Sequence, residues 1–106
     1  MITVNTAFIP GFEVMEVLGI AQGNVVQSKH VGRDIMAGLK TIVGGEIKGY
    51  TEMLTEARDI AYNRMVKQAE EMGADAIFNV RYTTSQVMQG SSELLAYGTA
   101  VKTVKV

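Results

Sequence analysis

TEMLTEARDIAYNRMVKQAEEM, residues 51–72, is the stretch that decides the fold of this chain. Its apolar residues fall on one side of a helical projection and comprise Met53, Leu54, Ala57, Ile60, Ala61, Met65, Ala69 and Met72. This spacing predicts an amphipathic helix that begins at Thr51, a suitable N-cap, and ends before Gly73. A helix of this length extends over about 33 Å, which is enough to lie across a whole sheet.

A glycine-rich stretch lies immediately before this helix, with the sequence Gly44-Gly45-Glu46-Ile47-Lys48-Gly49-Tyr50. Glycine allows backbone conformations that other residues resist, and we expect a loop over 44–50. Residues 33–43 show helical periodicity, with one apolar face made of Ile35, Met36, Leu39, Ile42 and Val43. The sequence therefore predicts a first helix over 33–43 that ends at Gly44-Gly45.

The N-terminal part of the chain predicts strands. Residues 12–27 are rich in Val and Ile. We expect one strand over Glu13–Ile20 and a second, or a continuation of the first, over Asn24–Lys29. The Gly23-Asn24 pair is a turn or bulge signal. Residues 1–11, which end at Ile9-Pro10-Gly11, are expected to form a loose or edge segment.

The C-terminal part predicts an antiparallel hairpin. Over residues 76–84, the side chains alternate between two faces, with Ala76, Phe78, Val80 and Tyr82 set against Ile77, Asn79, Arg81 and Thr83. Residues 85–92 are polar and predict a loop, and residues 93–106 predict a second long strand. This last strand carries apolar or neutral residues on both faces, and one of these faces needs cover.

Together these elements give the order β-β-α-α-β-β. The order predicts a single α+β domain over residues 1–106, with two helices on one face of a mostly antiparallel sheet. A monomer of this size has nothing left to cover the second face of the last strand. We therefore expect a homo-oligomer.

Composition excludes several classes of function. The chain of 106 residues has no cysteine and one histidine, and its net charge is -1. Disulfides, thiolate nucleophiles and cysteine-based metal sites are thus ruled out. The sequence shows no basic stripe, secretory signal or long apolar span, so we expect a cytoplasmic protein that binds neither nucleic acid nor membrane.

Several short motifs stand in a distinctive order: Arg33-Asp34, Ile42-Val43-Gly44-Gly45-Glu46, Gly49-Tyr50, Glu56-Ala57-Arg58, Gly73-Ala74-Asp75-Ala76-Ile77 and Gly98-Thr99-Ala100-Val101. This order, which covers nearly the whole chain, resembles the YbjQ-like family of small bacterial and archaeal proteins. The resemblance implies a small α+β fold and assembly into ring-shaped homopentamers. The family is also labelled as heavy-metal-binding. Soft heavy metals prefer thiolate ligands, and this chain has no cysteine to supply them.

The principal candidate site is a set of residues around the 44–50 loop: Arg33, Asp34, Gly44, Gly45, Glu46, Gly49 and Tyr50. Glycine N–H groups and the start of the long helix favour an anion, and Tyr50 adds an aromatic wall or a hydroxyl. The competing interpretation is a purely structural corner, because neither a GxGxxG motif nor a Walker lysine is present. For Arg33 and Asp34, the competing interpretation is an ion pair or a helix cap.

Three further groups carry possible chemistry. Glu46, Glu52, Glu56 and Asp59 offer oxygen ligands for a hard cation or Mn²⁺, or simply form a solvated helix face. His30 is a possible metal ligand, although a lone histidine is usually neither a ligand nor a switch. The third group lies on the predicted C-terminal hairpin and consists of Asn79, Arg81, Tyr82 and Tyr97. One interpretation is that these residues contact a ligand between subunits, and the other is that they form cross-strand pairs that fix the register.

These observations lead to three hypotheses. The first is a non-enzymatic homo-oligomeric binding protein that holds a metal ion or small molecule between the 44–50 loop and a neighbouring subunit. The second is a structural scaffold for another protein. The third is an enzyme, which would need acid–base work by Glu46, or by Asp34 with Arg33, and has no diagnostic spacing in its favour.

Overall fold

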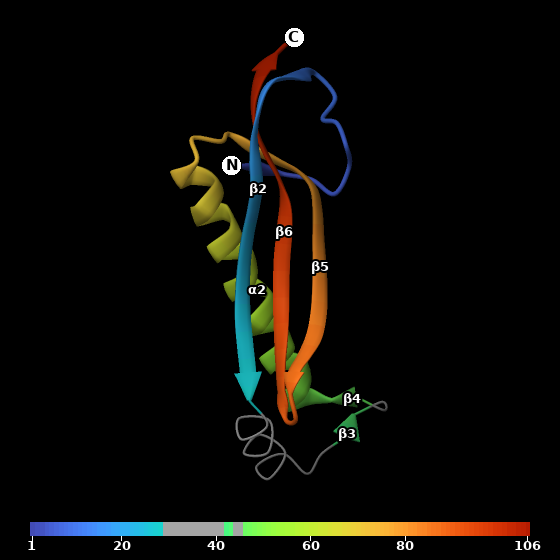
Figure 1. Ribbon diagram of the computed structural model, residues 1–106. Helices are drawn as coiled ribbons and strands as arrows, with labels where there is room; N and C mark the ends of the chain where they lie inside the picture. Colours follow the sequence, from blue (N-terminus) through green and yellow to red (C-terminus); the bar gives the residue numbers. More distant parts are fainter. Residues whose placement is uncertain (29–41, 44–45) are drawn as a thin grey trace.

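A computed structural model describes residues 1–28, 42–43 and 46–106 (Figure 1). A four-stranded sheet has the order β1-β5-β6-β2, and its strands are β1 (Ile2–Thr3), β2 (Phe12–Ser28), β5 (Ala76–Met88) and β6 (Ser91–Lys105). Neighbouring strands run antiparallel, except that β1 pairs with β5 in parallel. A separate two-stranded pair consists of β3 (Ile42–Val43) and β4 (Glu46–Ile47). The predicted α+β class is confirmed.

The long helix predicted over 51–72 is present as α2 (Lys48–Glu71). It packs on one face of the sheet (Figure 1). Gly73 has a φ of 87°, and the N–H groups of Gly73 and Ala74 donate to the carbonyls of Glu70 and Ala69, both at 3.0 Å. These two hydrogen bonds form the Schellman arrangement that a glycine after the last turn favours.

The prediction of a helix over 33–43 is wrong at its C-terminal end. Residues 33–41 lie outside the described residues, and Ile42-Val43 pair with Glu46-Ile47 as β3 and β4. β-branched residues on both sides of Gly44-Gly45 are a hairpin signal that outweighs the helical periodicity. The predicted 44–50 loop is wrong for the same reason, because its described residues belong to β4 and to the start of α2. The described residues thus contain one helix where the sequence predicted two.

β2 is one continuous strand, so the predicted continuation of the first strand is confirmed and the alternative of a separate second strand is wrong. Its register with β6 shifts between Val14 and Glu16 and between Val17 and Gly19, whereas Gly23 pairs regularly with Ala96. The predicted bulge at Gly23-Asn24 is therefore wrong. A Cβ atom at position 23 would collide with the backbone of α2 at Met65 N and Ala61 O. This glycine serves close packing of strand and helix instead.

The β5–β6 hairpin is confirmed, but the predicted 85–92 loop is wrong because β5 continues to Met88 and β6 begins at Ser91. A register shift lies between Phe78 and Arg81, where Asn79 adopts a φ of 54°. This bulge changes the alternation that the sequence predicted. Phe78 faces away from α2, whereas Tyr82, opposite Ala96, faces it.

The core has two parts, one on each face of the sheet. Between the sheet and α2 lies a cluster dominated by alanine: Ala21, Ala61, Met65, Ala69, Ile77, Ala96 and Ala100. On the other face, Ala76, Phe78 and Val101 pack under Val4 and Ile9 of the N-terminal segment. The expected edge character of residues 1–11 is confirmed by β1, which forms one edge of the sheet.

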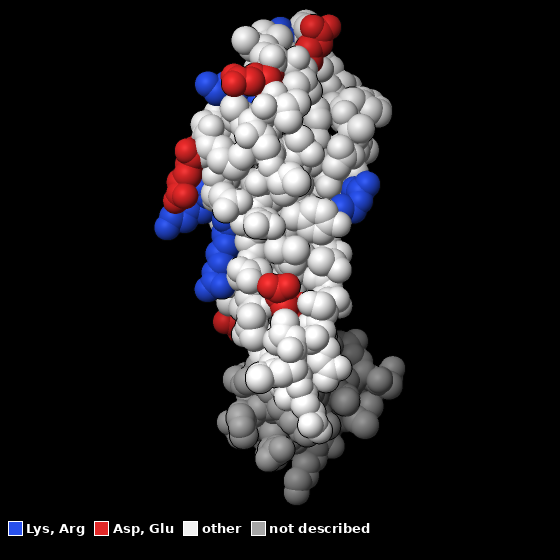
Figure 2. All heavy atoms as spheres, viewed as in Figure 1, with Lys and Arg blue, Asp and Glu red and all other residues white. Residues whose placement is uncertain are grey.

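The molecule is elongated, with principal extents of 53 × 29 × 17 Å and a radius of gyration of 17.0 Å. A compact chain of this length has a radius of gyration of about 13 Å. The accessible surface of 6929 Å² also exceeds the roughly 5800 Å² expected for a globular monomer of this mass. Several large apolar side chains are exposed, among them Val17, Ile20 and Val26 of β2. The face turned to the viewer in Figure 2, on which β2, β6 and β5 lie in front of α2, carries few charges in its middle.

Candidate functional site

The candidate site lies in a seam between α2 and β5, which exists because α2 sits to one side of the sheet. Gly23 of β2 allows the helix backbone to approach closely. Two α2 side chains bind the backbone of β2: Gln68 Oε1 accepts from Gln22 N at 2.7 Å, and Arg64 Nη1 donates to Asn24 O at 2.6 Å. These contacts hold α2 over β2 and β6 and leave the adjacent face of β5 partly open.

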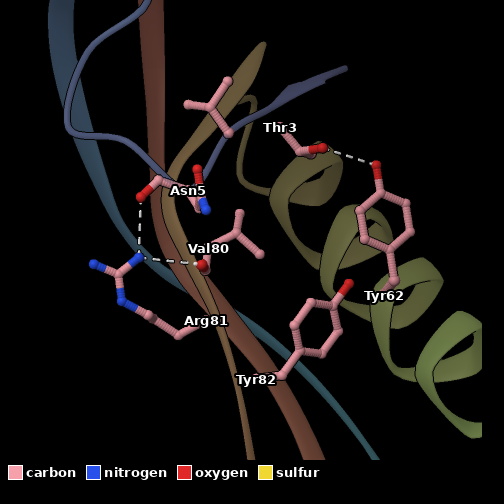
Figure 3. A pocket seen from close by; sticks show the side chains of 7 residues that line it. Thr3, Asn5, Tyr62, Val80, Arg81 and Tyr82 are labelled. Carbon is pink, nitrogen blue, oxygen red and sulfur yellow. Dashed lines mark hydrogen bonds between the residues drawn. The ribbon is translucent and has the colours of Figure 1, made fainter.

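The larger hollow in this seam has a volume of about 640 Å³ and opens to solvent. We call it the tyrosine pocket, and it is lined by Thr3, Val4, Asn5, Tyr62, Val80, Arg81 and Tyr82. Figure 3 shows Tyr62 reaching in from α2 and Tyr82 from β5, on the same side of the strand, while Arg81 extends the other way. The Asn79 bulge produces this arrangement, because it turns Tyr82 toward the helix.

Tyr62 is held in place by β1. Its hydroxyl shares a hydrogen bond of 2.9 Å with Thr3 Oγ1 (Figure 3). The segment after β1 is fixed in turn, since Val4 O accepts from Val80 N at 2.9 Å and Arg81 Nη1 donates to Asn5 O at 3.0 Å. One wall of the pocket is therefore preorganised by the N-terminal segment.

Tyr82 is the less constrained of the two tyrosines. Among the described residues its hydroxyl has no hydrogen-bond partner, and the side chain is 47% exposed. Burial raises the pKa of Tyr82 above its ordinary value of 10.0, and the neighbouring Tyr62 and Asp59 raise it further while Arg58 opposes them. Tyr82 thus presents a protonated hydroxyl, a hydrogen-bond donor, to the pocket.

A second, smaller hollow of about 190 Å³ lies farther along the same seam. Its lining combines apolar and charged side chains, and consists of Gln27, Leu54, Arg58, Thr84, Ser92, Glu93 and Leu94. Arg58 stands one helical turn from Tyr62, and Thr84 lies two residues beyond Tyr82 on the same face of β5. Because this volume is below the range usual for ligand sites, the tyrosine pocket is the stronger candidate.

A heavy-metal site requires ligands that the described residues do not bring together. The chain has no thiolate and a single histidine. Across residues 1–28, 42–43 and 46–106, no three His, Asp or Glu side chains are grouped to hold a metal ion. Glu52, Glu56 and Asp59 are instead exposed along α2. Soft metals prefer thiolate and imidazole, so this donor set does not fit one.

The described residues predicted from the 44–50 stretch fall in two consecutive elements. Glu46 lies in β4, and Gly49 and Tyr50 lie at the start of α2, one turn before Leu54. Arg33, Asp34, Gly44 and Gly45 lie outside the described residues, as does His30. Their part in a site stays a prediction.

Two of the predicted hairpin residues have both a cross-strand partner and a place in the pocket lining. Arg81 stands opposite Tyr97 and Tyr82 opposite Ala96, and Arg81 and Tyr82 both line the pocket. Their contact with a ligand stays a prediction. The sequence analysis missed Tyr62 and Thr3. A signal for Tyr62 existed, since Leu54, Arg58 and Tyr62 follow each other at intervals of four along one flank of the helix. Thr3 gave none.

The fold and seam define a class of small α+β protein in which a long helix packs off-centre on a four-stranded sheet. A family model, YbjQ_1, with the description "Putative heavy-metal-binding", matches residues 1–104. The chain belongs to this YbjQ family. No helix in the described part of the chain is both long and apolar enough to cross a membrane.

Relatives resemble the chain over its whole length. A UPF0145 protein of Vibrio parahaemolyticus is 67% identical over 105 residues, covering 99% of this chain and 100% of that protein. A UPF0145 protein of Thermotoga maritima is 60% identical over 106 residues, covering 100% of both. Among solved structures, a DUF74-family protein of unknown function from Pediococcus pentosaceus has a TM-score of 0.56 at 20% identity, covering 96% of this chain and 95% of that one. This last likeness concerns the fold alone.

Proposed function

We propose that this chain is a homo-oligomeric binding protein that holds a small molecule in the tyrosine pocket. The observation that carries the proposal is the open pocket itself, with two aromatic side chains from different elements and a volume of about 640 Å³. That volume falls within the range of roughly 300–1,000 Å³ usual for small-molecule sites. Protein ligand sites also commonly combine apolar walls with a few polar groups, as Thr3 and Tyr82 provide here.

The homo-oligomer is supported by the unusual exposure of apolar side chains on the sheet face away from α2. Val17, Ile20 and Val26 of β2 are 64%, 69% and 57% exposed. Apolar surface of this extent is typical of a protein–protein interface. The resemblance to the YbjQ-like family favours a pentameric ring, in which a neighbouring copy stands beside the seam.

Mass measurement and ligand screening test the two parts of this proposal separately. We expect light scattering of the purified chain to give a mass near five times 11.5 kDa, and a monomer would disprove the assembly. We expect a chemically diverse fragment screen, read by thermal shift, to yield binders that Tyr82→Ala abolishes. The control is Tyr97→Ala, on the opposite face of the sheet. Binders that are lost equally in both variants, or in neither, would disprove the site.

A scaffold that binds another protein is the second candidate, favoured by the sparsely charged face in Figure 2. Affinity capture separates it from the first candidate. A scaffold keeps its protein partner in Tyr82→Ala and loses it in Ile20→Glu. A small-molecule site loses its ligand in Tyr82→Ala and keeps it in Ile20→Glu. The metal suggested by the family description is tested by elemental analysis of the purified protein. A stoichiometric soft metal would contradict the choice of a small organic ligand.

A further inference from the structure

The tyrosine pocket has chemistry more specific than a general small-molecule site. Its two aromatic rings come from different elements, α2 and β5, and both project into the same hollow (Figure 3). Aromatic faces bind flat rings by stacking or edge-to-face contact, which gives more stabilisation than apolar contact of equal area. The aromatic walls of the pocket therefore favour a planar ring as its occupant.

The hydroxyl groups of the two tyrosines are not equivalent. Tyr62 already shares a hydrogen bond with Thr3, which fixes its ring as a wall. Tyr82 has no hydrogen-bond partner among the described residues and keeps its proton, because burial and the nearby Asp59 disfavour its ionised form. The Tyr82 side chain is 47% exposed, and a ligand that covers its hydroxyl removes it from water, which is costly unless the ligand supplies an acceptor. The occupant is thus expected to carry an acceptor at the Tyr82 end.

The charge in the lining of the pocket lies away from its two tyrosines. Among the residues that the structure describes, Arg81 is the only charged one in the lining. Its Nη1 donates to two backbone carbonyls, those of Asn5 at 3.0 Å and Val80 at 3.2 Å, and its side chain extends away from both tyrosines (Figure 3). Near Tyr82, Asp59 and Arg58 act with opposite signs. Backbone carbonyls are neutral, so the described lining keeps one positive charge, on the side away from the two tyrosine rings.

From this geometry we infer that the tyrosine pocket binds a planar aromatic molecule bearing a hydrogen-bond acceptor, with Tyr82 as donor and Tyr62 as fixed wall. The inference rests on the proposed function and names the ligand class of the same site. All the residues that it names lie within the described ranges. A two-ring molecule fits within the pocket volume of about 640 Å³.

Three matched probes separate planarity from hydrogen bonding. 2-Methoxynaphthalene is planar and has an acceptor, 2-ethylnaphthalene is planar without one, and 2-methoxydecalin has the acceptor but no flat ring. Their Kd values are measured by ligand-observed NMR on the full chain in its native assembly. We expect 2-methoxynaphthalene to bind about fivefold more tightly than 2-methoxydecalin, the size of a typical aromatic contact. We expect a preference of about fivefold over 2-ethylnaphthalene, the size of one neutral hydrogen bond.

Two conservative variants assign these preferences to residues. Tyr82→Phe keeps the ring, so it should retain the preference for planarity and lose the preference for the methoxy group. Tyr97→Phe, a matched hydroxyl deletion on the other face of the sheet, should change neither. Both variants retain the aromatic ring and are checked for the native assembly mass before titration.

The outcomes distinguish failure of this inference from failure of the proposed function. If 2-methoxydecalin binds as tightly as 2-methoxynaphthalene, and Tyr82→Ala still abolishes binding, the site stands and the ligand class is wrong. If Tyr82→Phe keeps the methoxy preference, the donor assignment is wrong. If none of the probes and no fragment binds, and Tyr82→Ala instead changes the assembly mass, the pocket is filled by a neighbouring copy and both proposals are overturned.

Discussion

At the scale of single residues, Asn79 decides where the candidate site forms. Its φ of 54° lies in the left-handed region, which asparagine tolerates better than most residues. The register shift at this point sends Tyr82 to the helix side of the sheet, away from the face that holds Phe78. With this backbone conformation the pocket has two aromatic walls, Tyr62 and Tyr82. Without it, Tyr82 would face the other side of the sheet and only Tyr62 would remain.

Substitution of Asn79 tests this role. Asn79→Gly should leave the free energy of unfolding nearly unchanged, because glycine adopts positive φ freely. Asn79→Val should destabilise the protein by about 1–2 kcal/mol, since a β-branched residue is strained in that region. Urea denaturation measures both. Equal stability of the two variants would show that this positive φ does not govern the bulge.

At the scale of elements, α2 protects the long outer strand β2. β2 is an edge strand of the sheet, and the edge of such a strand presents N–H and C=O groups that can pair with another chain. Gln68 accepts from Gln22 N, and Arg64 donates to Asn24 O, so the helix satisfies two of these groups. Intermolecular pairing through the middle of β2 is therefore blocked by side chains of the same molecule.

Removal of both side chains should expose this edge. In the double variant Arg64→Ala, Gln68→Ala, we expect hydrogen exchange at the Gln22 amide to accelerate by about tenfold or more, as its acceptor is lost. Aggregation on heating should also increase. Lys67→Ala, on the exposed side of the same helix, is the control. Unchanged exchange at Gln22 would mean that another group protects the edge.

The sequence predicts some elements better than others. Elements set by neighbouring residues were predicted well, whereas those set by contacts between distant parts of the chain were not. α2 was predicted within three residues at its start and one at its end, because its apolar stripe and Gly73 are local signals. β3 and β4 were missed, since Ile42-Val43 satisfied a helical period as well as a strand. The glycine at 23 has two local interpretations, a bulge and a close approach, and only the position of α2 selects between them.

The same distinction applies to the site. Tyr82 was among the candidate residues, but its face was predicted wrongly because a bulge is not visible in an alternating pattern. Thr3 enters the pocket through parallel pairing of β1 with β5, a contact between opposite ends of the sequence. The charged and glycine-rich motifs attracted attention in the sequence, whereas the described pocket is built mostly from uncharged residues.

At the scale of the whole molecule, the thin shape explains the expected association. A sheet with one helix has two layers, and the extent of 17 Å in the shortest direction leaves the far face of the sheet largely open. The fully buried side chains are mainly alanine, with Met65, Ile77 and Val101 as the largest. Such a small core stabilises a monomer weakly, and burial of Ile20 and Val26 between copies would add apolar contact.

Charge introduced on this face should therefore dissociate the assembly. Ile20→Glu combined with Val26→Glu is expected to reduce the mass measured by light scattering to that of a monomer and to lower the melting temperature, because buried carboxylates are strongly disfavoured at an interface. Glu70→Gln, a charge change on the exposed side of α2, should leave the mass unchanged. An assembly that survives the double substitution must use another surface.

The pairing of β2 with β6 has a consequence for how the protein is made. Phe12 lies opposite Lys105, so nearly the whole chain separates the two strands that share the longest ladder of the sheet. During synthesis, β2 emerges early and cannot complete this ladder until the last residues have been added. Its apolar side chains stay exposed to solvent until then. Loss of even a few C-terminal residues should therefore harm the first long strand to be synthesised.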